Sequence, residues 1–205
     1  MDIVCQNETP ADIYHLMTQT VVPRPIAWVL TEHPNQSYNL APFSYFAPIS
    51  SQPPVVVFSG GVKPTDGSVK DSIANFERTE RAVIHIAHTE LAAEVTESAR
   101  TLPLNESELD RCNLSLTEFT NFPMPRIAEC RVALGCTLQT IHEIGTVPQR
   151  LVVAEVTHLY IDDNCIEMDA KGRRKIPAAK LDPLGRLGAG DYAGLGEVIH
   201  IPRPD

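Results

Sequence analysis

The segment from Asn39 to Gly61, NLAPFSYFAPISSQPPVVVFSGG, constrains the fold more than any other part of this sequence. It holds enough apolar side chains for a β-sheet core, but Pro42 and Pro48 interrupt it and a Pro-Pro pair breaks it again. Because proline has no backbone N–H to donate, a strand that contains it lies at a sheet edge or bends there. Such a bend leaves main-chain groups near residues 41–46 without sheet partners, which is costly in a buried position. The segment therefore predicts a kinked sheet edge with unpaired backbone groups.

Alternating patterns and turn residues around this segment outline a mainly antiparallel protein. A hairpin is expected from residues 25–31 and 37–44, with turn chemistry between them. A helix follows Ser68, which either forms a capping box with Asp71 or leaves Asp71 as the N-cap. Thr89 is expected to cap a second helix. We expect further strands over residues 55–59, 82–87, 128–144 and 150–161, irregular chain over 101–125 with a short helix after Asn105, and loops from 171 onward.

This order of elements predicts one domain over residues 1–205, in which residues 1–22 lead in and residues 171–205 form a loop-like tail. A chain of this length with 43% hydrophobic composition can bury one core. Strands dominate and no βαβ alternation is present, so we expect a mainly β fold with helices, arranged as a partly open barrel.

Charge and composition argue against several classes of protein. A formal net charge of −9 disfavours a nucleic-acid binder, which depends on clustered Lys and Arg. The densest basic run, residues 171–175, is expected to be a solvated loop. No stretch approaches the ~18 apolar residues of a membrane helix, and the N-terminus lacks the basic region of a signal peptide. Five cysteines without a C-x-x-C pair indicate reduced thiols in a cytoplasmic protein.

Motifs for metal, nucleotide and acyl-transfer chemistry fail on their spacing. Gly188, Gly190 and Gly194 are spaced as G-x-G-x-x-x-G without a flanking strand and helix, which disfavours a dinucleotide fold. His85 and His88 would point to opposite faces of a strand, so a buried, hydrogen-bonded His85 is favoured over a shared metal. There is also no G-x-S-x-G motif. We predict no metal site and identify no catalytic residue.

Several short stretches together resemble the flavin reductase-like proteins of the FMN-binding split-barrel class, which include flavoredoxin-like proteins. They are PRPIAWV at residues 23–29, NLAPFSYF at 39–46, PPV at 53–55, KDS at 70–72, and RLG at 186–188 with Tyr192. Ser72 stands where Thr is common in that family, and Ala189 where a second Gly often lies. The resemblance implies a homodimeric, Greek-key antiparallel split barrel with FMN at or near the subunit interface. It also implies NADH or NADPH as a transient reductant.

The resemblance places a flavin against the kinked edge, where the hydrogen-bonding edges of its ring would supply partners to the unpaired backbone groups. Asn39 and Ser44 are candidates for ring or ribityl contacts, although each could instead cap a turn. The aromatic residues of the segment divide between the core and the ring wall, while Trp28 is expected in the core. The flavin contacts predicted along this edge are Thr31, Asn39, Ala41, Pro42, Phe43, Ser44 and Phe46.

The phosphate of FMN requires positive charge and N–H donors. A helix that starts near residues 70–72 offers its N-terminus together with the side chains of Lys70 and Ser72. Ser59, at the end of a strand, is expected to reach the same region. Arg24 is a second candidate cation, and a structural ion pair is the alternative for it.

The resemblance implies that NAD(P)H reduces FMN and that electrons pass on to free flavin, a flavin-dependent oxygenase or another acceptor. One alternative is an FMN-bound electron carrier without direct NAD(P)H oxidation, and another is a flavin-free binding module. We also expect a partner subunit to complete the site. Arg186 is left with three roles: dimer contact, nicotinamide entrance or anchor of the tail.

Overall fold

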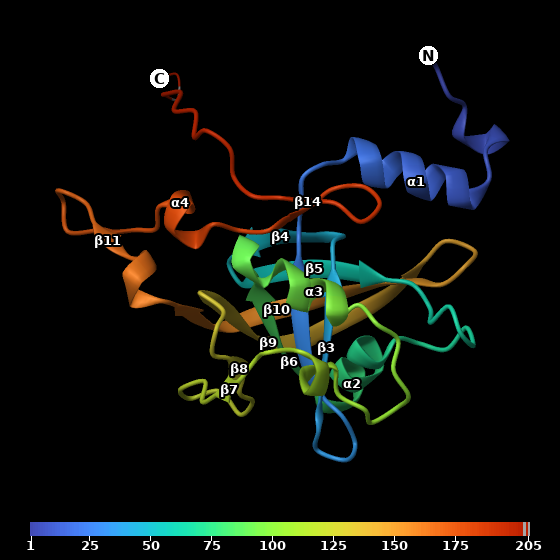
Figure 1. Cartoon of the computed structure of the whole chain (residues 1–205), viewed down its shortest axis with the longest axis horizontal. Helices are drawn as coiled ribbons and strands as arrows, with labels where there is room; N and C mark the ends of the chain where they lie inside the picture. Colours follow the sequence, from blue (N-terminus) through green and yellow to red (C-terminus); the bar gives the residue numbers. More distant parts are fainter. Residues whose placement is uncertain (203, 205) are drawn as a thin grey trace.

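Within residues 1–202 and 204, which the computed structural model describes, the body of the protein is a seven-stranded antiparallel sheet (Figure 1). The strands lie in the order β3-β2-β6-β9-β10-β5-β4. Their bounds are β2 (Ala27–Glu32), β3 (Tyr38–Phe43), β4 (Phe46–Ser51), β5 (Pro54–Gly60), β6 (Arg81–Ile86), β9 (Val132–Ile144) and β10 (Gln149–Ile161). The strands predicted from alternation are therefore all present, with shifts of a few residues at their ends.

The sheet curls into a split barrel because its two edge strands are consecutive in the chain. Only Ser44 and Tyr45 lie between the end of β3 and the start of β4. Consecutive Cα atoms are about 3.8 Å apart, so this link holds the two edges within roughly 11 Å of each other at that end. The Ser59 amide of β5 also donates to the Tyr45 carbonyl at 2.9 Å, and bulges between β9 and β10 add curvature. The predicted antiparallel, partly open barrel with helices is confirmed.

The two prolines that interrupt the segment, Pro42 and Pro48, both lie on edge strands, as expected. Pro42 lies in β3 and Pro48 lies in β4, at opposite edges of the sheet. Their missing N–H groups therefore cost no interior hydrogen bond. The segment thus supplies both edge strands, one on either side of the split, and the strand β5 that pairs with β4.

An inner and an outer apolar cluster stabilise the fold. The inner cluster joins barrel strands to Ile73 and Phe76 of helix α2 (Asp71–Thr79), and the Phe43 and Phe58 rings lie 5.0 Å apart in it. The outer cluster covers β2 and β6 with helix α3 (Ala92–Glu97) and the chain that follows it. Trp28 is fully buried there, and its Nε1–H donates to Ser98 Oγ at 2.8 Å. The prediction that Trp28 belongs to the core is confirmed.

Shorter elements decorate the barrel. The predicted short helix after Asn105 is the 3₁₀ turn η3 (Glu108–Arg111), which packs on β3. The remaining elements are η1 (Cys5–Asn7), α1 (Pro10–Thr20), β1 (Arg24–Pro25), η2 (Thr89–Leu91), β7 (Leu116–Thr117), β8 (Arg126–Ile127), η4 (Asp163–Cys165), β11 (Glu167–Met168), β12 (Arg174–Lys175), α4 (Ala178–Leu181), β13 (Gly185–Arg186) and β14 (Tyr192–Ala193).

The expected helix caps were wrong. Helix α2 has Lys70 at its N-cap and no side-chain capping bond. The Ser68 amide instead donates to Asp66 Oδ1 at 2.9 Å, while Asp71 Oδ1 lies 2.7 Å from Lys63 Nζ. Thr89 begins η2, and its hydroxyl bonds the Asp182 carboxylate instead of capping α3. These polar side chains bond to other partners in the fold, so they do not form the helix caps that their spacing predicted.

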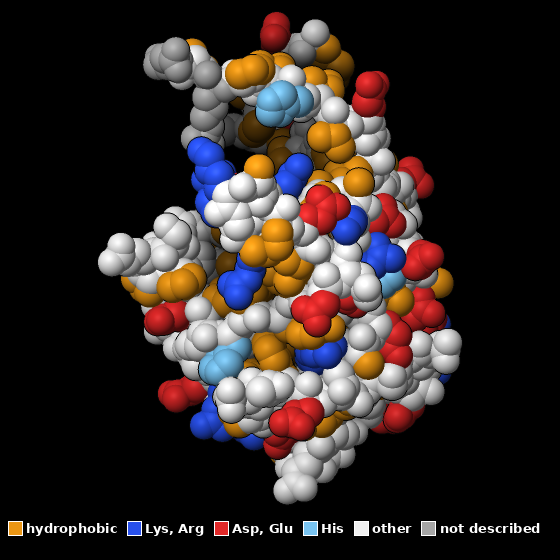
Figure 2. Space-filling view, turned by 90° about the vertical axis from the view of Figure 1, so that its left-hand side faces the viewer, with side chains coloured by type: hydrophobic (Ala, Val, Ile, Leu, Met, Phe, Trp, Pro, Cys, Tyr) orange, Lys and Arg blue, Asp and Glu red, His pale blue; other side chains and the backbone are white. Residues whose placement is uncertain are grey.

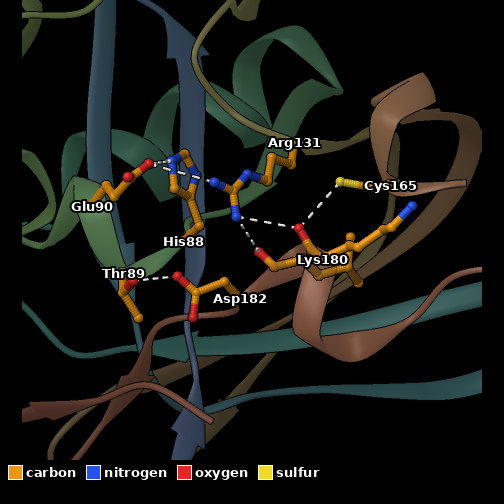
Figure 3. A network of polar contacts seen from close by, with 8 residues as sticks. His88, Thr89, Glu90, Arg131, Cys165, Lys180 and Asp182 are labelled. Carbon is orange, nitrogen blue, oxygen red and sulfur yellow. Dashed lines mark hydrogen bonds and ion pairs between the residues drawn. The ribbon is translucent and has the colours of Figure 1, made fainter.

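The C-terminal region, predicted to be loop-like, carries short elements and is anchored to the body. Figure 3 shows the Thr89–Asp182 bond beside a second link, in which Arg131 donates to the Lys180 carbonyl at 3.2 Å. Arg131 also lies 3.4 Å from the Glu90 carboxylate. Farther along, β13 pairs with β1 and β14. This anchoring brings residues 185–193 back to the barrel.

His85 is a buried structural residue, as predicted. Its Nδ1 lies 3.2 Å from the Trp28 carbonyl, and its Nε2 accepts from the Ile127 amide at 2.9 Å. Burial lowers the pKa of His85 to about 4. Among the described residues, no three His, Cys, Asp or Glu side chains are grouped to hold a metal ion. All five cysteines are free, and no described helix is long and apolar enough to span a membrane.

Candidate cofactor site

The outer edge of β3 is open where the predicted ligand-binding segment runs. The Leu40 amide points away from β2 and donates to Glu108 Oε2 at 2.8 Å. In an antiparallel strand the two backbone groups of a residue point the same way and alternate residues share a side. Pro42 therefore presents its carbonyl to the same outer side, where it has no N–H to offer. After Leu40, the outer side of β3 therefore presents the Pro42 carbonyl, which can accept a hydrogen bond from a ligand.

A polar cavity lies at one end of this edge, against the start of α2. Asn39 and Ala41 of β3 face Lys70, Asp71 and Ser72 across it. The first N–H groups of a helix have no partner within the helix, so the start of α2 attracts anions. The further lining residues are Lys63, Pro64, Ser98, Ala99, Arg100, Thr101, Leu102 and Glu108.

Lys70 is the cation best placed for an anion in this cavity. The carboxylate of Asp71 is already paired with Lys63, and Arg100 is paired with Glu97 at 2.8 Å. No ion pair to Lys70 is found in residues 1–202 and 204. Its Nζ lies 5.5 Å from the centre of the Phe43 ring, and burial lowers the pKa of Lys70. A half-buried ammonium without a counter-ion favours an incoming anion.

Further cavities continue the polar one along the strand. Lys70 also lines a cavity with Pro42, Phe43, Ser44 and Ser59. The Ser59 hydroxyl accepts a hydrogen bond from Gln149 Nε2 at 3.3 Å on this side of the barrel. Pro42 and Ser44 are in turn shared with a cavity that Arg186 and Tyr192 line. Together these cavities form a cleft along β3, which we call the β3 cleft.

Asn39 and Ser72 are brought together by the fold at the floor of the β3 cleft. Asn39 Nδ2 donates to Ser72 Oγ at 2.7 Å, and both side chains are buried. A serine hydroxyl that accepts this bond still has its own proton to donate. Ser72 can therefore hydrogen-bond an anion while Asn39 orients it.

Three predicted site residues lie outside the β3 cleft. Thr31 is fully buried, and its hydroxyl accepts from Asn75 Nδ2 at 3.4 Å. Phe46, in β4, lines a more apolar cavity beside Met17 and Val21, which meets the cleft only at Ser44 and Tyr45. Strand alternation does not predict which face of the hairpin α2 covers, so it could not show that Thr31 lies beneath this helix.

Arg24 is also placed in a structural role, different from both alternatives considered for it. Its guanidinium donates to the carbonyls of Thr18, Val21 and Leu187, and Nε lies 3.3 Å from Ser44 Oγ. It makes no ion pair within the described chain. Arg24 thus ties the end of α1 and the C-terminal region to the loop that follows β3.

Three charged residues of the cavity were not predicted from the sequence: Lys63, Arg100 and Glu108. Glu108 is only 4% exposed. Burial raises its pKa to about 7, and the Leu40 amide opposes that shift. These residues lie in loops and turns, where no periodicity marks them.

Arg186 lies at the far end of the β3 cleft. Its guanidinium stacks 4.5 Å from the centre of the Tyr192 ring and donates to the Ala189 carbonyl. This placement fits an anchor of the tail that also borders the cleft.

Comparison with known proteins agrees with this architecture. A model of the family described as "Flavin reductase like domain" matches residues 17–175. The chain belongs to this family. The predicted split-barrel recognition, made from the RPIAW, NLAPFS and KDS stretches, is thereby confirmed.

Individual family relatives match over nearly the whole chain. The uncharacterized protein YwrF of Bacillus subtilis is 33% identical over 94% of both chains. Nitrilotriacetate monooxygenase component B from Bacillus cereus is 30% identical, with a TM-score of 0.89 and 98% of both chains covered. The 2-nitrobenzoate 2-nitroreductase NbaA of Pseudomonas fluorescens is 25% identical, with a TM-score of 0.85, and covers 100% of this chain and 96% of its own.

Proposed function

We propose that this protein binds FMN in the β3 cleft and acts as a flavin oxidoreductase with NADH or NADPH as reductant. The observation that carries the proposal is the continuity of the cleft. It joins a helix N-terminus and a half-buried lysine to an open sheet edge with apolar walls. FMN has its parts in the same order: a charged phosphate, a polar ribityl chain and a flat ring with hydrogen-bonding edges.

The polar end of the cleft fits the phosphate. Lys70 supplies charge, Ser72 supplies a hydroxyl, and the first turn of α2 supplies N–H donors. Ser59 lines the adjoining cavity and reaches the Lys70 side of the cleft. These groups come from β5 and α2, two elements held together by the inner apolar cluster. Packing between β5 and α2 thus supports both sides of the proposed phosphate site.

The edge of β3 fits the ring and the ribityl chain. Asn39, Ala41, Pro42 and Ser44 line the cleft in sequence order, and Phe43 lies beside Lys70. The outward carbonyl of Pro42 is an acceptor for the ring N3–H, and Asn39 and Ser44 offer side-chain hydrogen bonds. Arg24 contributes indirectly by holding Ser44.

Bound FMN supplies the redox chemistry, because its ring can take up a hydride equivalent from a reduced nicotinamide. The protein contributes orientation, which can be worth several powers of ten in rate. The β3 edge holds the ring in place and excludes water from one face, and Lys70 keeps the phosphate end fixed. We assign no general acid or base, because the hydride step requires none.

The acceptor of the electrons is proposed to be free flavin or a partner such as a flavin-dependent oxygenase. In support, the Bacillus cereus relative is named as component B of a monooxygenase. The five free thiols support a reducing, cytoplasmic location. On the face shown in Figure 2, basic side chains lie singly among acidic and apolar ones, which gives no support to nucleic-acid binding.

We further propose that the protein is a homodimer in which a second subunit covers the cleft. Helix α1 and the C-terminal segment extend beyond the barrel at the same end (Figure 1). Apolar side chains gather at that end on the face in Figure 2. The exposed apolar residues of these two segments are Tyr14, Met17, Val21, Val22, Leu195, Val198, Ile199 and Ile201. So many exposed aliphatic groups favour an interface.

Anaerobic stopped-flow mixing of the FMN-loaded protein with NADH and NADPH tests the proposal. We expect the flavin absorbance to bleach in a reaction that saturates with at least one nicotinamide. A protein that holds FMN but is bleached by neither would be an electron carrier. A preparation that binds no flavin would instead be a module for another ligand.

A further inference from the structure

A buried carboxylate lies in the same cavity as the proposed phosphate site. Glu108, in η3, lines it opposite Lys70 and Ser72. The turn is held on β3 from both sides: Ser107 Oγ donates to the Tyr38 carbonyl, and Glu108 Oε2 accepts from the Leu40 amide. Glu108 therefore cannot turn into solvent without breaking the cover of the sheet edge. Under the proposed function, a phosphate and this carboxyl group share one cavity.

The charges around Glu108 do not neutralise it. Asp71, on α2, faces the same cavity and disfavours the carboxylate, while Lys63, from the loop before α2, favours it. Lys63 already pairs with Asp71, and Arg100 pairs with Glu97. The charged lining residues are Lys63, Lys70, Asp71 and Arg100, and η3 itself adds Asp110 and Arg111. Burial, as the largest effect, raises the pKa of Glu108 to about 7, so both protonation states are accessible near neutral pH.

We infer that Glu108 is a proton-linked specificity residue of the β3 cleft: its neutral carboxyl group admits a phosphate monoester, and its carboxylate repels one. The inference rests on the proposed function, because it assumes that the phosphate of FMN occupies this cavity. It adds a control that the flavin contacts alone do not provide. The ratio of the affinities for FMN and for riboflavin, which lacks the phosphate, therefore depends on pH.

The sign of the effect follows from linkage. A doubly charged phosphate nearby disfavours the carboxylate, so it raises the pKa of Glu108 in the complex. Binding then takes up a proton, and affinity falls as the pH rises from the free pKa to the bound pKa. In that window the FMN dissociation constant rises by at most about tenfold per pH unit. Riboflavin has no phosphate, so its affinity stays level there.

The experiment is a fluorescence titration of FMN and riboflavin against the full-length protein between about pH 6.5 and 8.5. Glu108→Gln removes the charge and keeps a side-chain oxygen for the Leu40 amide. Glu106→Gln is the matched control, because Glu106 is exposed two residues away and does not line the cavity. We expect wild type and the control to lose FMN affinity by about tenfold or more over this range. Glu108→Gln should change less than about threefold and bind FMN more tightly than wild type at the upper limit.

Calorimetry of the wild-type protein and of Glu108→Gln supplies a second readout, and the variant separates Glu108 from Lys70, whose pKa burial also lowers. Titrations in buffers of different ionisation enthalpy should show an uptake of about half a proton or more per FMN near pH 7.5, and none for riboflavin. Equal pH slopes in Glu108→Gln and wild type, or no proton uptake with FMN, would overturn this inference while FMN binding stood. Absence of FMN binding at every pH would overturn the proposed function itself.

Discussion

The two edges of the barrel come from one continuous segment, but only the β3 edge lines the cleft that we propose for FMN. Strand β3 contains Pro42 and lies beneath η3 and beside the start of α2. Strand β4 contains Pro48, and Ala47–Ser51 along it are exposed, with Ile49 57% exposed. Proline makes each of them an edge strand. What covers the edge decides whether it can bind a ligand.

The physical difference is access to water. Backbone groups along β4 can hydrogen-bond solvent, so they need no other partner. Those along β3 are partly screened by α2, η3 and the C-terminal region, so an unpaired carbonyl there gains more from a ligand. The polar side chains follow the same division, because Lys70, Ser72 and Glu108 all face β3.

The largest effect should come from removing the anion-binding groups on the β3 side. We expect Lys70→Ala combined with Ser72→Ala to weaken FMN binding by about 100-fold, or about 2.7 kcal/mol, because two strong phosphate contacts are lost. Riboflavin affinity should change less than about threefold. Fluorescence titration measures both ligands.

The matched control for that variant is Ser50→Ala with Ser51→Ala on β4, which should leave both affinities as they are. Equal losses for FMN and riboflavin in the Lys70, Ser72 variant would show that these residues do not hold a phosphate.

A second prediction concerns the buried His85, which holds β6 against the carbonyl of Trp28 in β2, the strand beside β3. Its pKa is about 4 in the folded state and near 6.5 unfolded, so the unfolded chain binds more protons between these values. Stability is therefore complete above about pH 6.5 and falls below it, by about 2 kcal/mol at pH 5. Urea unfolding at pH 7.5 and pH 5 measures the loss.

His33 and His88 also have lowered pKa values and add to the loss in the same direction. Comparison with His85→Gln isolates the contribution of His85. An unchanged pH dependence in that variant would show that His85 is not the main buried base.

The smallest effect tests the cover of the β3 edge by η3. Ser107→Ala removes the bond to the Tyr38 carbonyl and the cap on the Leu109 amide. We expect a loss of about 1 kcal/mol in the free energy of unfolding. Ser50→Ala on β4, whose hydroxyl only accepts from the exposed Gln52 amide, should stay within about 0.5 kcal/mol. Equal losses of unfolding free energy in the two variants would show that η3 does not stabilise the β3 edge more than solvent stabilises the β4 edge.

The strands and the edge position of the prolines were readable from the sequence, because strand alternation and proline chemistry act locally. The sequence did not predict that Pro42 and Pro48 lie at opposite edges of the sheet. That arrangement depends on how the sheet curls, and two residues between the strands do not reveal it. The caps expected at Ser68, Asp71 and Thr89 failed for a related reason, since distant partners compete for the same side chains.

The residues that line the candidate site were predictable where a local motif marked them. Lys70 and Ser72 follow from a helix start, and Asn39, Pro42 and Ser44 follow from the interrupted strand. Thr31 was proposed for its nearness across the hairpin and Arg24 as a second cation, yet the structure buries Thr31 under α2 and gives Arg24 carbonyl partners. Glu108 and Arg100 enter the cavity from chain that has no periodic pattern. Their roles depend on packing alone.

A crystal structure of the protein with FMN tests the central claim most directly. We predict density for the phosphate at the start of α2, within hydrogen-bonding distance of Lys70 and Ser72, and for the ring along Ala41–Ser44 of the β3 edge. Density for FMN on the β4 side, or an empty β3 cleft in crystals grown with saturating FMN, would contradict the account.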